Sequence, residues 1–231
     1  MNILNYLAQN FYSSVLMILV TVAALVISIR YYSRHRNLRI FTYYIAFSLL
    51  QSTTDIFALL FVPAHGKPTR IFPLVLALTT GLAFMLFEFI ICNLFILHYI
   101  TSPLRRRIIR INALGYFVLL ILTFTLASKY IHILPYSSLL LESVFLVPPC
   151  LFYFYELFQT VNLQPLKEQP SFWVITGILF LNASSIPLQL TEHFLGSYSE
   201  AAYTLNYILY IVLFILLIKA YLCTPEKLTN A

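Results

Sequence analysis

The sequence predicts an all-α membrane protein, a bundle of seven transmembrane helices with its N-terminus outside and its C-terminus in the cytoplasm. Of its 231 residues 61% are hydrophobic and 10% are charged, whereas soluble domains carry about 25% charged residues. Seven apolar runs are long enough to cross about 30 Å of hydrocarbon: 11–30, 40–62, 72–100, 109–127, 134–157, 172–195 and 202–222. They occupy most of 1–231, so we expect a single transmembrane domain.

The basic residues predict the orientation. Arginines follow the first and third runs, at Arg30, Arg34, Arg36, Arg39, Arg105, Arg106, Arg107 and Arg110. Lys167, Lys219 and Lys227 fall on the same side, and Lys67, Arg70 and Lys129 fall on the other. Because positive charge is retained in the cytoplasm, this asymmetry predicts that the N-terminus lies outside and the C-terminus lies in the cytoplasm. No basic segment precedes the first run, so we expect it to be a helix and not a cleaved signal peptide.

The net charge of +6 follows from the same rule. Basic residues beside helix ends face anionic lipid headgroups. We therefore expect the lipid bilayer as a partner and no nucleic acid.

The first run carries only weakly polar side chains and is expected to pack or to face lipid. In the second run Ser48, Gln51 and Asp55 recur at steps of three and four, so they share one helical face. A carboxylate inside a membrane indicates a functional site. The alternative for Asp55 is a structural hydrogen bond to neighbouring serine or threonine side chains.

The third run places Glu88 between Phe87 and Phe89 near mid-depth. A charged glutamate there would be expensive, so Glu88 is expected to be either protonated or paired. Both a functional and a purely structural use are compatible with this position. The fourth run has no ionisable group after Arg110 and is predicted to be peripheral.

The fifth run has a continuous polar face of Ser138, Glu142, Pro149, Tyr153 and Glu156. Glu142 lies in the outer half and is a candidate ligand-binding residue. Glu156 lies near the inner interface, where it is either solvated or paired with an arginine. The pair Pro148 and Pro149 should break or bend the helix, which makes Pro149 a candidate hinge.

The sixth run has the clearest polar stripe. Asn182, Ser185 and Gln189 recur at helical steps, and Glu192 or His193 continues them. Lipid tolerates such a stripe only where it faces a protein interior or a water-filled cavity. Pro187 removes a backbone N–H and frees the carbonyl of Ala183, so a kink and a second hinge are expected there.

The seventh run carries Tyr203, Asn206, Tyr207 and Tyr210 in its outer half. Several polar residues of four helices therefore project to one depth. We expect them to form an outward-facing polar pocket that binds a ligand: Asp55, Glu142, Gln189, Glu192, His193, Asn206 and Tyr203.

The residues argue against several other chemistries. Lys219 lies too close to the cytoplasmic end to hold retinal, and the histidines are scattered over loops and opposite faces. The cysteines, Cys92, Cys150 and Cys223, have no metal-binding spacing. No phosphate loop or catalytic signature is present. We expect no catalytic residue, no metal and no cofactor, and we favour a non-enzymatic role over an enzymatic one.

Several segments resemble a group of small seven-helix membrane proteins of Bacteroidota whose function is not established. These are Phe87–Phe89, Phe154–Phe158, the segment Glu168–Pro187 with its Pro170–Trp173 start, Asn206–Tyr207 and Lys219–Cys223. The resemblance covers nearly the whole chain. Members are often encoded beside sensor histidine kinases, which implies a sensory role by association.

The sequence favours a sensory or signalling component that binds a small ligand, or senses a membrane property, in the outward-facing pocket. With no output domain of its own, it would relay the signal to a cytoplasmic partner such as a histidine kinase. The alternative is a small-solute or proton-coupled transporter that uses Asp55, Glu88 and Glu142. An intramembrane lipid-modifying enzyme is a third alternative, and the pattern is compatible with a homo-oligomer.

Overall fold

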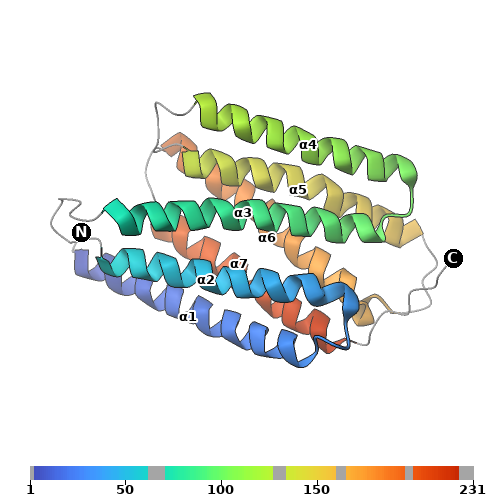
Figure 1. Ribbon diagram of the computed structural model, residues 1–231, viewed down its shortest axis with the longest axis horizontal. Helices are drawn as coiled ribbons and strands as arrows, with labels where there is room; N and C mark the ends of the chain where they lie inside the picture. The colour runs from blue at the N-terminus through green and yellow to red at the C-terminus, as the bar shows by residue number, and fades with distance from the viewer. Residues whose placement is uncertain (1–2, 62–70, 127–133, 160–164, 196–199, 224–231) are drawn as a thin grey trace.

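The computed structural model describes residues 3–61, 71–126, 134–159, 165–195 and 200–223, and these residues form helices joined by short turns (Figure 1). The seven α-helices are α1 (Ile3–Arg30), α2 (Arg39–Phe61), α3 (Ile71–Tyr99), α4 (Pro103–Leu126), α5 (Leu134–Gln159), α6 (Pro170–Leu195) and α7 (Glu200–Leu222). Two short 3₁₀ turns, η1 (Arg36–Leu38) and η3 (Leu166–Glu168), precede α2 and α6. The described residues contain no strand, which confirms the predicted all-α fold.

Consecutive helices run in opposite directions and close into a ring (Figure 1). Around this ring α1 packs on α2 and α7, α3 packs on α2 and α5, and α6 lies between α5 and α7. Helix α4 stands outside the ring against α5 and α3. Only 17% of its membrane span is buried inside the bundle, against 50% for α3. The predicted peripheral position of the fourth helix is therefore confirmed.

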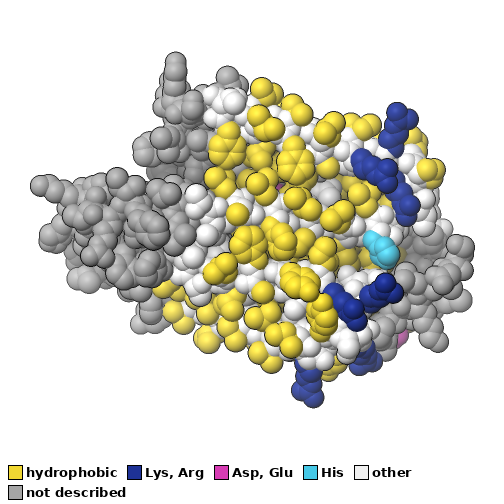
Figure 2. Space-filling view, in the orientation of Figure 1, with side chains coloured by type: hydrophobic (Ala, Val, Ile, Leu, Met, Phe, Trp, Pro, Cys, Tyr) yellow, Lys and Arg dark blue, Asp and Glu magenta, His cyan; other side chains and the backbone are white. Residues whose placement is uncertain are grey.

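Five helices, α3 to α7, are long and apolar enough to cross a membrane over their described residues. Large apolar side chains cover the outside of the bundle, as the yellow surface in Figure 2 shows. Such a surface is stable in contact with lipid and not with water. The chain is therefore a multi-pass membrane protein.

The charged residues separate to one end of the bundle (Figure 2). We call this the basic end. It carries every lysine and arginine that the structure describes: Arg30, Arg34, Arg36, Arg39, Arg105, Arg106, Arg107, Arg110, Lys167 and Lys219. Among the described residues, positive charge is thus confined to one end of the bundle.

Helix boundaries agree with the apolar runs except at two starts. Helix α1 begins at Ile3 instead of residue 11, and α4 begins at Pro103 instead of residue 109. Proline suits the first helical position, because its missing N–H would have no helical acceptor there. The arginine-rich segment after Pro103 is therefore the start of α4. The apolar run that predicted this helix begins later, because the arginines are charged.

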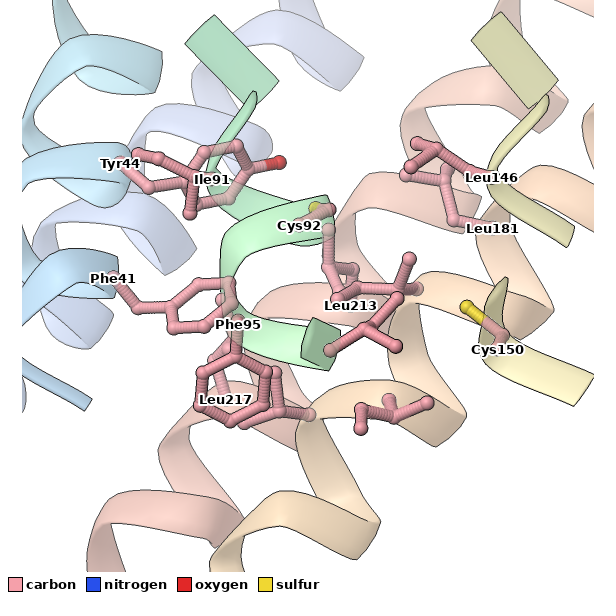
Figure 3. Close-up of a cluster of buried hydrophobic side chains, with 14 of the residues drawn as sticks. Phe41, Tyr44, Ile91, Cys92, Phe95, Leu146, Cys150, Leu181, Leu213 and Leu217 are labelled. Carbon is pink, nitrogen blue, oxygen red and sulfur yellow. The ribbon is translucent and has the colours of Figure 1, made fainter. Parts of the chain in front are cut away.

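The core is built from aromatic and aliphatic side chains of α2, α3, α5, α6 and α7 (Figure 3). Phe41 of α2 meets Phe95 of α3 edge to face, with ring centroids 4.9 Å apart. Tyr44 of α2 stacks on Phe84 of α3 at 5.4 Å. These contacts fix α2 against α3 beside the polar residues of the interior.

Helices α6 and α7 approach most closely at Gly177. A Cβ atom there would lie 2.8 Å from Leu213 Cδ1 and 3.4 Å from Leu216 Cδ1. Small residues allow such close helix packing in membranes. Gly177 therefore sets the distance between α6 and α7.

We predict that Gly177→Ala lowers the free energy of unfolding by about 1–3 kcal/mol, because the added methyl overpacks the interface. Gly81→Ala is the matched control. Its Cβ would lie 3.3 Å from Gln51 Nε2, the movable end of a long side chain. Equilibrium unfolding in mixed micelles of mild detergent and SDS measures both values. Equal effects of the two substitutions would contradict this account of the α6–α7 contact.

Candidate functional site

Glu88 of α3 is buried in the interior and links three helices. Its Oε1 accepts a hydrogen bond from Tyr44 Oη of α2 at 3.1 Å. Its Oε2 accepts a longer bond from Tyr210 Oη of α7 at 3.4 Å. The sequence predicted that Glu88 is protonated or paired, and the structure shows that its partners are hydroxyl groups of two neighbouring helices.

Glu142 of α5 is a second buried carboxyl group. It lies close enough to Glu88 to interact with it electrostatically. Its Oε1 has no hydrogen-bond partner among the described residues. The described lysines and arginines all lie at the basic end, so no positive side chain among them reaches either carboxyl group. A carboxyl group buried in this way is costly unless something compensates it.

Tyr116 is the residue of the peripheral helix α4 that lies near Glu88 and Glu142. Its ring stacks on Phe89, with centroids 3.8 Å apart, and the residue is fully buried. Its ring centroid also lies 6.0 Å from that of Phe145, one turn after Glu142 on α5. The hydroxyl has no hydrogen-bond partner among the described residues.

These residues form one group, which we call the interior polar cluster. Its members come from five helices and are Tyr44, Glu88, Tyr116, Glu142 and Tyr210. All their polar atoms are oxygens. The cluster therefore offers carboxyl and hydroxyl oxygens inside the bundle, with no nitrogen cation among the described residues to balance them.

The polar stripe predicted on α6 is buried, as expected. Two of its members bond their own helix: Asn182 Nδ2 donates to Ile178 O at 2.9 Å and Ser185 Oγ donates to Leu181 O at 2.8 Å. Such bonds satisfy a polar side chain without any ligand. Gln189 differs, because its Oε1 is buried and has no partner among the described residues.

Gln189 and Glu142 belong to the two helices of the α5–α6 contact. At the other end of the same contact Tyr153 Oη donates to Ser171 Oγ at 3.0 Å, which sets the register of the two antiparallel helices. That register puts Asn182 level with Glu142, and Gln189 about two turns beyond it. Because side chains tilt toward the N-terminus of their helix, the two side chains tilt toward each other.

The other predicted ligand-binding residues are only partly visible. The side chains of Asp55, Glu192, His193 and Tyr203 lie outside the described residues, although each position belongs to a helix. Asn206 is half-buried on α7, one turn before Tyr210 and on the same face. The structure thus brings Glu142 to Glu88 and leaves the wider predicted pocket as a prediction.

Helices α5 and α6 both continue through their prolines, so neither Pro149 nor Pro187 breaks its helix. Pro149 cannot donate to the carbonyl of Phe145, four residues earlier. Asn112 of α4 replaces that donor: its Nδ2 lies 2.7 Å from Phe145 O. The role of both prolines as hinges stays a prediction.

Glu156 is fully compensated at the basic end. Its carboxylate accepts hydrogen bonds from the backbone N–H groups of Thr101 and Ser102, at 2.6 and 3.1 Å, and from Thr101 Oγ1 at 2.9 Å. Arg105 Nη1 forms an ion pair with it at 2.8 Å. This confirms the predicted pairing with an arginine, and it gives Glu156 a structural role at the start of α4.

The basic end is held together by Tyr221 of α7. Its hydroxyl donates to Leu38 O at 2.7 Å and lies 3.0 Å from Thr42 Oγ1. The same end of the molecule contains Trp173, whose Nε1 donates to Lys167 O at 2.8 Å. Helix α7 is thus bonded to the turn that joins α1 and α2.

Sequence reasoning missed Tyr44 and Tyr116. Tyr44 precedes Ser48 by one turn, so it continues the face of Ser48 and Gln51. Tyr116 follows Asn112 by one turn on α4 in the same way. Extending each polar stripe by one helical step would have found both tyrosines.

Comparisons of the chain with protein-family models, with curated proteins and with solved structures find no match. The geometry of the described residues is therefore the basis for any functional conclusion.

We predict that Asn112→Ala lowers the free energy of unfolding by about 1–3 kcal/mol, because it leaves the partly buried carbonyl of Phe145 without a donor. Thr123→Ala on the same helix is the control, since Thr123 Oγ1 donates to Leu119 O of its own helix. Its cost should stay within about 0.5 kcal/mol. Unfolding in mixed micelles measures both, and an Asn112→Ala effect as small as that of the control would refute the assigned bond.

Proposed function

We propose that the chain is a seven-helix sensory component of a bacterial inner membrane, which binds a small ligand from the outer side and relays the event to a cytoplasmic partner. The observation that carries this proposal is the burial of Glu88 and Glu142 in the bundle with no positive partner among the described residues. Intramembrane ionisable groups are expensive and mark functional sites.

The site would extend from the interior polar cluster toward the end opposite the basic one. Glu142, Gln189 and Asn206 occupy that half of α5, α6 and α7. If the basic end is cytoplasmic, as the positive-inside rule favours, this half faces outward. Asp55, Glu192, His193 and Tyr203 belong to the same half in the proposal.

Helix α7 supplies a route for the relay. Tyr210 contacts Glu88 in the interior, and Tyr221 bonds Leu38 at the basic end. The two tyrosines are about three helical turns apart on one rigid helix. A ligand that changes the Glu88 contact would shift α7 and, with it, the turn between α1 and α2, and Pro149 and Pro187 would act as hinges.

The cytoplasmic surface fits an acidic partner. Arg34, Arg36, Arg106 and Arg107 are exposed at the basic end, and Glu156 there is already paired with Arg105. Clustered positive charge speeds and orients the encounter with an acidic protein. Together with the resemblance to proteins encoded beside sensor kinases, this supports a histidine kinase as the partner.

A proton-coupled or small-solute transporter is the second candidate. The specific observation in its favour is again the pair Glu88 and Glu142, since carriers place carboxyl groups at mid-membrane for coupling. Uptake by proteoliposomes that collapses with Glu88→Gln would establish a transporter and reject the receptor.

We predict that a photo-crosslinker at the exposed Ser33, next to Arg34, captures a signalling protein in native membranes. Replacing Arg34, Arg36, Arg106 and Arg107 by glutamine should reduce capture at least tenfold, because the attraction to an acidic surface is lost. Replacing the same four by lysine retains the charge and should preserve most of the capture. Mass spectrometry identifies the captured protein, and a C-terminal reporter checks that the orientation is unchanged.

Capture that is insensitive to the glutamine replacements, or capture of lipid-synthesis and housekeeping proteins alone, would contradict the proposed relay.

A further inference from the structure

Two oxygens of the interior polar cluster are buried without a partner. Glu142 is 4% exposed and Tyr116 is 0% exposed. Neither Glu142 Oε1 nor Tyr116 Oη has a hydrogen-bond partner among the described residues. Native proteins rarely leave such atoms unpaired, and those that do so usually bind an ion, a water molecule or a ligand there.

The surrounding charge points to a cation. Glu88 and Glu142 interact electrostatically, and the Tyr116 ring packs on Phe89, next to Glu88, and on Phe145, one turn after Glu142. None of these carries a positive charge. The positive side chains that the structure describes lie at the basic end (Figure 2). A positive ion beside the two carboxyl groups would stabilise their ionised forms.

The donor atoms fit a hard cation. The cluster presents carboxyl and phenol oxygens only, and oxygen ligands suit hard cations. Glu88 is held in place through Tyr44 and Tyr210, at 3.1 and 3.4 Å. Glu142 Oε1 and Tyr116 Oη, which have no such bonds among the described residues, are the atoms left to bind.

The ligand set favours a monovalent ion over a divalent one. Calcium requires six to eight oxygens and magnesium a near-ideal octahedron. Among the described residues no three His, Cys, Asp or Glu side chains come together in a way that could hold a metal ion. Two carboxyl groups, one of them already occupied by tyrosine hydroxyls, balance a single positive charge better than two.

We infer that the interior polar cluster binds a monovalent metal cation, with Glu142 as its anionic ligand and Tyr116 as a neutral oxygen ligand. This inference rests on the proposed function, since it assigns a class of ligand to the same site. Bound there, the ion would lie between α4 and α5 and beside Glu88. Its binding and release would change the charge next to the hydrogen bond between Glu88 and Tyr210 of α7.

Equilibrium binding of ²²Na⁺ to the purified full chain in detergent tests the inference. We expect saturable binding of about one ion per chain that unlabelled Na⁺ displaces and N-methylglucamine does not. Glu142→Gln should abolish binding, and Tyr116→Phe should weaken it about tenfold. The matched controls, Glu168→Gln and Tyr155→Phe, alter exposed side chains at the basic end and should leave binding unchanged.

Absence of saturable Na⁺ binding to the wild-type chain would overturn the inference, whatever the variants do. So would binding that persists in Glu142→Gln, or that falls equally in Tyr155→Phe. Size-exclusion profiles show whether each variant is folded, and Tyr116→Phe serves as the test if Glu142→Gln is not. Loss of ion binding with intact partner capture would leave the sensory proposal standing, whereas ion binding without any captured partner would reject that proposal alone.

Discussion

The central constraint on this molecule is the cost of placing carboxyl groups in an apolar helix bundle. Glu88 meets that cost through two tyrosine hydroxyls, and in doing so it joins α3 to α2 and α7. Tyr44 is in turn held by the aromatic packing between α2 and α3. Glu142 has only part of this compensation, because its Oε1 is unpartnered among the described residues. The carboxyl group on the α2 side of the interior is therefore hydrogen-bonded, whereas the one on the α4–α5 side keeps an oxygen without a partner among the described residues.

Glu156 shows what a structural carboxylate looks like in the same chain. Three hydrogen bonds and the ion pair with Arg105 satisfy it, and its position at the start of α4 adds the favourable field of a helix N-terminus. Glu142 lies on the same helix and has none of these partners among the described residues. The contrast explains why we assign a ligand to Glu142 and none to Glu156.

Much of the fold follows from the sequence, because a helix in lipid must satisfy its backbone internally and must be about 20 residues long. Apolar runs therefore located the helices, and polar stripes located Glu88 and Glu142. The rotation of each helix about its axis does not follow from such patterns. Tyr44 and Tyr116 resemble interfacial or packing aromatics until the neighbouring helices are in place. Likewise, Asn112 is an isolated polar residue until Pro149 frees a carbonyl beside it.

The measurement that tests this account most directly is a double-mutant cycle between Glu88→Met and Tyr210→Phe. The free energy of unfolding of each variant is measured in mixed micelles. If Glu88 joins α3 to α7, the two substitutions should be non-additive, with a coupling energy of about 0.5–1.5 kcal/mol. The methionine keeps the length of the side chain, and the phenylalanine removes only the hydroxyl. Additivity within about 0.3 kcal/mol would show that the contact contributes nothing, and the proposed connection between the interior polar cluster and α7 would then be wrong.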